Sequence, residues 1–107
     1  MRSVRGDIYA LKAPPDARGH EQRGHRYAVV VQSDLLNLST LLVAPTTSRG
    51  NPASFRPEIE MDGQTVRVLL EQTRAVDPGR LGNFAGRLSA FELQAVDRAL
   101  SEVLDLS

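Results

Sequence analysis

The chain has 107 residues, and its 13 arginines and lysines balance its 13 aspartates and glutamates. This length suits one domain over residues 1–107, and a net charge of zero gives no overall field that would attract a polyanion. The lack of cysteine excludes disulfides and thiolate metal sites. No run of about 18 apolar residues could span a bilayer, and the N-terminus is too polar for a signal peptide, so we expect a cytoplasmic protein without membrane contact.

The charges are unevenly distributed along the chain. Residues 1–57 carry eight cations and four acids (+4), residues 58–88 carry four and five (−1), and residues 89–107 carry one and four (−3). The first half therefore contains the candidate anion-binding surface. Twelve of the 13 cations are arginine, which suits bidentate phosphate contacts, although a coding bias toward arginine would give the same count.

Two strands are predicted in the first third of the chain. The first covers Asp7–Ala13 and is ended by Pro14-Pro15. A polar loop, Asp16–Gly24, follows, and its length exceeds that of typical hairpin connections, which favours a functional role. His25–Gln32 has a continuous apolar middle, as in a strand covered on both faces. A turn over residues 33–39 then leads to the next strand.

The middle of the chain predicts a strand, a long loop and a hairpin. The strand is Leu41–Thr47, and the loop is Ser48–Pro57, which contains Gly50, Asn51 and two prolines. Glu58–Met61 and Thr65–Glu71 are alternating runs joined by Asp62-Gly63, and this dipeptide is the strongest short hairpin signal.

Two further short strands precede the C-terminal helix. Arg74–Asp77 reads as a strand end, Asp77-Pro78-Gly79 as a turn and Asn83–Leu88 as the last strand. About six short strands with one terminal helix predict a mainly β fold, either a small, strongly bent sheet or a partly open barrel.

The helix has a clear beginning. Ser89 and Glu92 fit a capping box, and Leu88 and Leu93 are placed as the hydrophobic staple. An apolar stripe at helical spacing follows, which we expect to pack on the sheet rather than to form a partner groove. Its members are Leu93, Val96, Leu100, Val103 and Leu104.

Five motifs, in order and at fitting spacings, resemble the MazF/PemK toxins of bacterial toxin–antitoxin pairs. The resemblance runs essentially from end to end of the chain. The motifs are Arg5-Gly6-Asp7-Ile8-Tyr9, Gly24-His25-Arg26 leading into Val29-Val30-Val31-Gln32, Val43-Ala44-Pro45-Thr46-Thr47-Ser48, Leu70-Glu71-Gln72-Thr73-Arg74-Ala75-Val76-Asp77 and Gly86-Arg87-Leu88-Ser89.

The resemblance implies a fold and a function that composition does not show. The implied fold is a small SH3-like or CcdB/PemK-type partly open barrel with a C-terminal helix. Members of the family are homodimeric endoribonucleases that cut single-stranded RNA at a short sequence without metal or other cofactor. A cognate antitoxin silences them, and we expect its inhibitory segment to be acidic and partly disordered, because a basic RNA groove would attract such a segment.

By position in the motifs, the family's catalytic arginine falls on Arg26 and its catalytic threonine on Thr47. In such a reaction the 2′-hydroxyl attacks its own phosphate and leaves a 2′,3′-cyclic phosphate and a 5′-hydroxyl. A guanidinium would stabilise the phosphorane, and a hydroxyl could donate to a phosphate oxygen. Arginine is a poor base, so the general base stays open. Tyr27 stands where the family often has proline, which concerns specificity more than chemistry.

We expect the remaining RNA contacts at Glu21, Ser48, Arg49 and Gln72, although Glu21 and Gln72 could equally be ordinary surface residues. His20 lies in the first predicted loop and His25 directly follows its last residue, and histidines in such loops are usually solvated. Together with Glu21 they would make only an improvised metal cluster, so no metal site is expected.

Other interpretations of the same residues remain. Arg26 could be a solvated strand end, and Thr47 a β-former before a turn-making serine. A CcdB-like protein of similar fold would instead bind and inhibit a topoisomerase, without any need for Arg26. A degenerate relative would retain only antitoxin binding.

Overall fold

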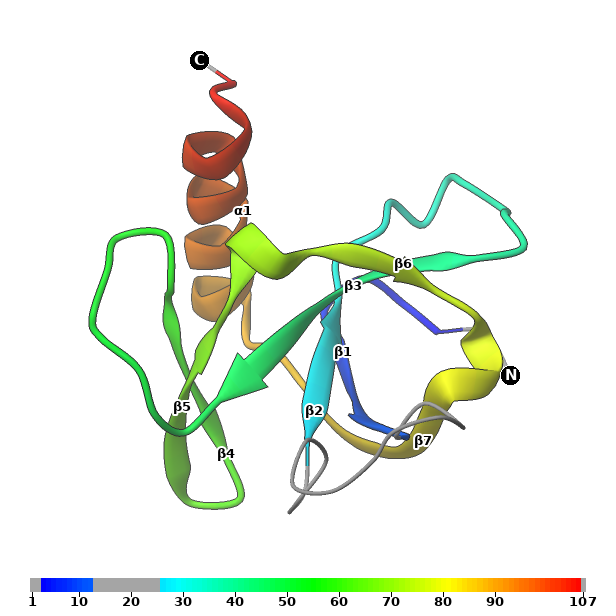
Figure 1. Cartoon of the computed structure of the whole chain (residues 1–107), viewed down its shortest axis with the longest axis horizontal. Coiled ribbons are helices and arrows are strands. Elements are labelled where there is room, and N and C mark those ends of the chain that lie inside the picture. Colours follow the sequence, from blue (N-terminus) through cyan, green and yellow to red (C-terminus); the bar gives the residue numbers. More distant parts are fainter. Residues whose placement is uncertain (1–2, 13–25, 107) are drawn as a thin grey trace.

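The described part of the chain is a strongly curled antiparallel sheet with a helix packed beside it (Figure 1). A computed structural model describes residues 3–12 and 26–106. The elements are β1 (Asp7–Leu11), β2 (Tyr27–Val30), β3 (Leu41–Thr47), β4 (Glu58–Met61), β5 (Gln64–Val68), the 3-10 turn η2 (Leu70–Gln72), β6 (Arg74–Val76), the 3-10 turn η3 (Pro78–Arg80), β7 (Leu81–Arg87) and α1 (Ala90–Leu104).

The sheet is organised around β3. Among the described residues the strand order is β4-β5-β3-β2-β1-β7, and β6 also pairs with β3. One edge of β3 therefore carries β2, and the other carries β6 near its start and β5 near its end. In Figure 1 β3 crosses from the β1–β2 layer toward the β4–β5 hairpin. The predicted mainly β, partly open barrel with a C-terminal helix is confirmed.

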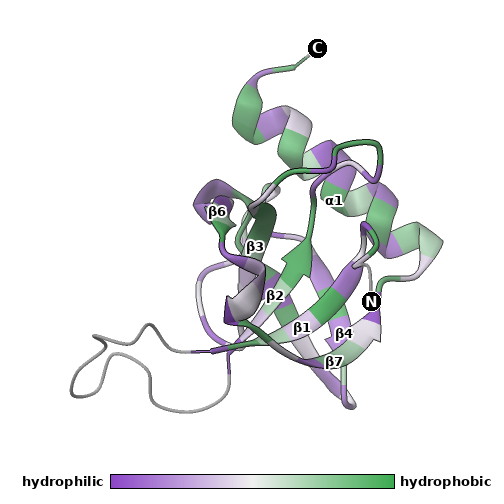
Figure 2. Ribbon diagram, turned by 90° about the vertical axis from the view of Figure 1, so that its right-hand side faces the viewer, coloured by the Kyte–Doolittle hydropathy of each residue, from purple (hydrophilic) through white to green (hydrophobic). Residues whose placement is uncertain are grey.

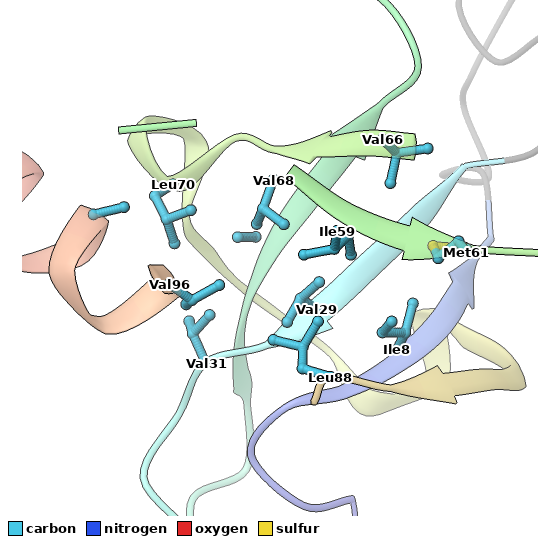
Figure 3. Packing of buried hydrophobic residues seen from close by; sticks show 12 residues of the cluster. Ile8, Val29, Val31, Ile59, Met61, Val66, Val68, Leu70, Leu88 and Val96 are labelled. Carbon is cyan, nitrogen blue, oxygen red and sulfur yellow. The ribbon is translucent and has the colours of Figure 1, made fainter. Parts of the chain in front are cut away.

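Apolar residues cover both faces of the central strands, as Figure 2 shows in green along β1, β2 and β3. Ile8, Val29 and Ala44 face a larger cluster that also takes in β4, β5 and α1 (Figure 3). Residues one position along these strands, such as Tyr9, Ala28 and Val43, face a smaller cluster closed by Val76 and Leu81. Burial on both faces explains the continuous apolar run within His25–Gln32, which the sequence analysis interpreted as a strand covered on both sides.

The helix begins as its sequence predicts. Ser89 Oγ accepts from the N–H of Glu92 at 3.1 Å, and Glu92 Oε1 accepts from the N–H of Ser89 at 2.8 Å. Such a cap is worth about 1 kcal/mol. The other oxygen of Glu92 accepts from the N–H of Glu60 at 2.9 Å and ties the helix to β4. The apolar stripe was wrong at Leu104, which is 59% exposed, because the last turn of α1 extends past the sheet (Figure 1).

The predicted hairpin forms, but its second strand is shorter than expected. Asp62 and Gly63 both have positive φ, as a two-residue turn of type I′ requires. The strand ends at Val68 because the next N–H, that of Leu69, donates to the carbonyl of Pro45 at 2.8 Å and turns the chain into η2. Leu70 is still buried, at 1% exposed.

A buried carboxylate joins the first and last strands. Asp7 Oδ1 accepts from Arg87 Nε at 2.7 Å, and Asp7 Oδ2 accepts from the N–H of Val4 at 2.9 Å and from the hydroxyl of Tyr9 at 3.4 Å. Burial raises the pKa of Tyr9 above its usual value of 10.0, and the charge and hydrogen bond of Asp7 raise it further, while Arg87 lowers it. The phenol therefore stays protonated in the fold at pH values where a free tyrosine ionises.

We expect Tyr9→Phe to flatten the loss of stability at alkaline pH. Because the folded-state pKa lies above that of the unfolded chain, stability is fully present below the unfolded value and falls as the pH rises through the folded value. Chemical unfolding measured from about pH 8 upward should show a shallower decline for Tyr9→Phe than for the parent. Equal slopes would contradict this account.

Candidate functional site

The predicted catalytic pair lies at the ends of two neighbouring strands. In the β2–β3 ladder Val29 pairs with Ala44 and Ala28 pairs with Pro45, so the same register, continued by two residues, places Arg26 opposite Thr47. One contact joins β3 to β2 at this end of the ladder, and another joins β1 to the residue before β2. The hydroxyl of Thr46 donates to the carbonyl of Tyr27 at 3.3 Å, and the N–H of Leu11 donates to the carbonyl of Arg26 at 2.8 Å.

Strand alternation places both residues on the same face of the sheet. Tyr27 packs against the larger cluster and Thr46 is only 8% exposed, so both point inward. Arg26 and Thr47, one position away in each strand, belong to the opposite face. Arg26 is exposed and Thr47 half-buried. Arg26 and Thr47 therefore lie on one face of the sheet, and their catalytic roles stay predictions.

The hydroxyl of Thr47 is oriented by the loop that follows it. The N–H of Arg49 donates to Thr47 Oγ1 at 3.1 Å, a local turn that uses one of the oxygen's lone pairs. The hydroxyl proton can then point outward and donate to a ligand oxygen. Ser48 and Arg49, two of the predicted RNA contacts, are exposed in this turn directly beside Thr47.

A second arginine lies on the other side of Thr47. In the β3–β5 ladder Thr47 pairs with Arg67, so Arg67 also lies on the outward face. Arg67 in turn pairs with Glu58 of β4, and its NH2 group contacts Glu58 Oε2 at 2.7 Å. Arg26, Thr47, Arg67 and Glu58 therefore form one row across four strands. The sequence analysis missed Arg67: the two-residue hairpin turn indicates its pairing with Glu58, but no local signal places β5 beside β3.

The last predicted contact, Gln72, is exposed at the end of η2. The hydrogen bond from Leu69 to Pro45 places the start of η2 beside β3, two residues before Thr47. Nε and NH2 of Arg56 contact Oε2 of Glu71 at 2.9 and 2.6 Å, so the 48–57 loop is tied to the same turn. Glu21, His20 and His25 lie outside the described residues.

The surface around Thr47 is basic. Arg74 pairs with Val43 of β3, and Val43 belongs to the face of the sheet that also carries Arg26 and Arg67, so Arg74 lies on that face too. Arg49 adds a further cation in the turn after Thr47. Arginine forks on an exposed face suit phosphate oxygens. Two hollows, about 200 Å³ beside Gln32 and about 270 Å³ beside Arg5, lie elsewhere. Residues 3–12 and 26–106 include no group of three metal-ligating side chains.

Comparison with known proteins assigns this arrangement to a family. Residues 4–104 match the family described as the PemK-like, MazF-like toxin of type II toxin–antitoxin systems. The chain belongs to this family. A candidate toxin of Mycobacterium tuberculosis (strain H37Rv) is 42% identical over 73 residues, which cover 68% of this chain and 69% of that protein.

Solved structures share the fold of this toxin. An endoribonuclease from a mycobacterial species, in complex with its cognate antitoxin, superposes with a TM-score of 0.81 at 14% identity, over 99% of this chain and 98% of that one. A MazE–MazF structure from Deinococcus radiodurans gives 0.75 at 28% identity, over 98% and 97%. The predicted MazF/PemK family is confirmed. Within the described residues of the toxin, no helix is long and apolar enough to cross a membrane.

We expect Glu71→Gln to loosen the loop beside Thr47 without unfolding the toxin. The Arg56–Glu71 pair is about a quarter exposed, so its loss should cost about 0.5–1 kcal/mol of global stability. Amide exchange across residues 49–56 should become faster. Glu60→Gln is the matched control, because it removes a β4 carboxylate that accepts from the hydroxyl of Thr65 in the hairpin and does not contact Arg56. Equal exchange in the two variants would refute the assignment.

Proposed function

We propose that this toxin is a sequence-specific, metal-independent endoribonuclease that cuts single-stranded RNA in the cytoplasm. The observation that carries the proposal is the placement of Arg26 and Thr47 at adjacent strand ends on one outward face, in a chain of the MazF-like family. The basic surroundings of Thr47 support a polyanionic substrate.

The reaction is a transesterification. The 2′-oxygen forms a bond to the phosphorus while its proton passes to a base, the bond from phosphorus to the 5′-oxygen breaks, and that oxygen gains a proton. The products are a 2′,3′-cyclic phosphate and a 5′-hydroxyl. Arg26 donates to the equatorial phosphorane oxygens and stays charged at any working pH. Thr47, with its oxygen already accepting from Arg49, donates to a phosphate oxygen or orients the 2′-hydroxyl.

Sequence preference arises at the residues that border this pair. Ser48, Arg49 and Gln72 lie on the loop and turn next to the end of β3, and Glu21 belongs to the segment before β2. Single-stranded RNA is read through splayed base edges and stacking. Tyr27 packs against the core, so its ring supports the position of Arg26 rather than a base.

The partners we propose are a second copy of the chain and an antitoxin. The solved relatives include an endoribonuclease with its cognate antitoxin and a MazE–MazF pair. A two-fold dimer would bring two sites together, so that one antitoxin chain could block both. An acidic, partly disordered segment would bind the cations around Thr47 in place of RNA.

The decisive experiment incubates the purified toxin with a long RNA of mixed sequence in EDTA and maps the new 5′ ends. We expect 5′-hydroxyl ends at one recurring short motif. Arg26→Ala should lower the cleavage rate about 100-fold or more, and Thr47→Val about tenfold or more, whereas Thr47→Ser should retain most activity.

Arg98→Ala is the control, because it removes an exposed arginine of α1, outside the strands that carry Arg26 and Thr47. Intact RNA with the parent toxin would sink the nuclease proposal. Toxicity that survived Arg26→Ala unchanged would favour a CcdB-like protein that inhibits a topoisomerase by binding.

Binding of the antitoxin should weaken with salt. Attraction between an acidic segment and exposed arginines is screened over about 8–10 Å at physiological ionic strength. Titration of the toxin with a peptide of the acidic antitoxin segment at about 50 and 200 mM salt should show the loss of affinity. Affinity independent of salt, or affinity unchanged when Arg18, Arg23 and Arg26 are neutralised in a folded protein, would contradict the charge mechanism.

A further inference from the structure

Arg67 is an arginine beside Thr47 that the cleavage mechanism above does not use. It pairs directly with Thr47 across the β3–β5 ladder, and residues paired in this way have Cβ atoms about 4.5–5.5 Å apart on one face. Arg26 lies across the other edge of β3. Thr47 is therefore flanked by an arginine on each side, along a line that crosses the strands.

Arg67 is held in place but keeps the capacity to bind a ligand. Its NH2 contacts Glu58 Oε2 at 2.7 Å, and its NH1 donates to the carbonyl of Arg56 at 3.4 Å. These contacts use two of its five N–H donors. The side chain is 21% exposed and Glu58 is 55% exposed, so water screens the pair and its strength is modest.

We propose that Arg67 is a second phosphate-binding arginine, which contacts an RNA phosphate next to the scissile one. This inference rests on the proposed nuclease function. A strand of RNA that places one phosphate between Arg26 and Thr47 and continues across β3 must pass Arg67. At Arg67 a phosphate of the RNA competes with the carboxylate of Glu58 for the N–H donors of the guanidinium, because a guanidinium binds phosphate bidentately as it binds carboxylate.

Arg67 is thus a positioning residue, and Glu58 is its counter-ion when RNA is absent. Loss of the contact should weaken RNA binding and leave the chemical step nearly intact, because the scissile phosphate is stabilised by Arg26 and Thr47. Loss of Glu58 should have the opposite effect on binding, since it frees Arg67 and removes a negative charge from the path of the RNA.

The test uses a short RNA that contains the mapped cleavage site, and the same RNA with a 2′-deoxy nucleotide at that site. We expect Arg67→Gln to raise KM and the Kd for the uncleavable RNA about fivefold to tenfold, with kcat within about twofold of the parent. The slope of log affinity against log salt should shrink by about 0.7, the value for one lost contact to a single strand. Glu58→Gln should lower the Kd.

Three variants separate RNA binding from a structural role. Arg98→Gln removes the same charge from α1 and should leave Kd and kcat unchanged. The double variant Arg67→Glu with Glu58→Arg keeps a cross-strand ion pair but moves the cation away from Thr47, so its affinity for RNA should stay low. Arg67→Lys keeps a cation beside Thr47, so its affinity should lie between those of Arg67→Gln and the parent.

The proposal is overturned if Arg67→Gln binds RNA as Arg98→Gln does, if kcat falls while KM is unchanged, or if the double variant regains full affinity. Each of these results leaves the nuclease function standing, because that function is judged by cleavage with the parent toxin and its loss in Arg26→Ala. Absence of cleavage by the parent would instead remove the premise.

Discussion

The backbone pairing of β3 is the constraint on which the rest of the structure depends. This strand pairs with β2 on one edge and with β6 and then β5 on the other. Pro45 stands in its middle, where a central strand ordinarily rejects proline. The carbonyl of Pro45 accepts from the N–H of Leu69, so the backbone nitrogen of Pro45 faces the edge of β3 that carries β6 and β5. At Pro45 the pairing with β6 has ended and the pairing with β5 has not begun, so no ladder hydrogen bond from this nitrogen is lost. The proline is tolerated at this change of partner, and the change of partner bends the sheet into a barrel.

The alternation of β3 couples the core to the site. Ala44 and Thr46 point inward, while Pro45 and Thr47 point to the opposite face. A slip of one residue against β2 would bury Thr47 and expose Thr46, so burial of the larger cluster fixes which hydroxyl faces outward. The site is therefore positioned by apolar packing at a distance from it, and the loop that follows adds only the hydrogen bond from Arg49.

Local patterns predicted much of this structure. The capping box at Ser89, the Asp62-Gly63 hairpin and the strand before Thr47 could each be found because the physics that forms them lies within a few residues. What failed was non-local. Leu104 has helical spacing but no sheet beneath it, and the second hairpin strand ends early because Pro45 captures Leu69. The position of Arg67 beside Thr47 depends on two strands some 20 residues apart in sequence, and no short pattern encodes that pairing.

A chain of zero net charge can still present a basic site, because most of the acidic side chains described below form ion pairs or caps away from Thr47. Asp7 is buried against Arg87, Asp97 contacts Arg5, and Glu92 caps α1. Glu71 pairs with Arg56 of the 48–57 loop. These carboxylates stabilise the joints between elements, so their charge is neutralised or lies away from the row that contains Thr47. Within that row Glu58 is the acidic member, and it is mostly exposed, which lets a phosphate take its place beside Arg67 at little cost. Local arrangement, and not total charge, therefore determines the field that an RNA strand meets.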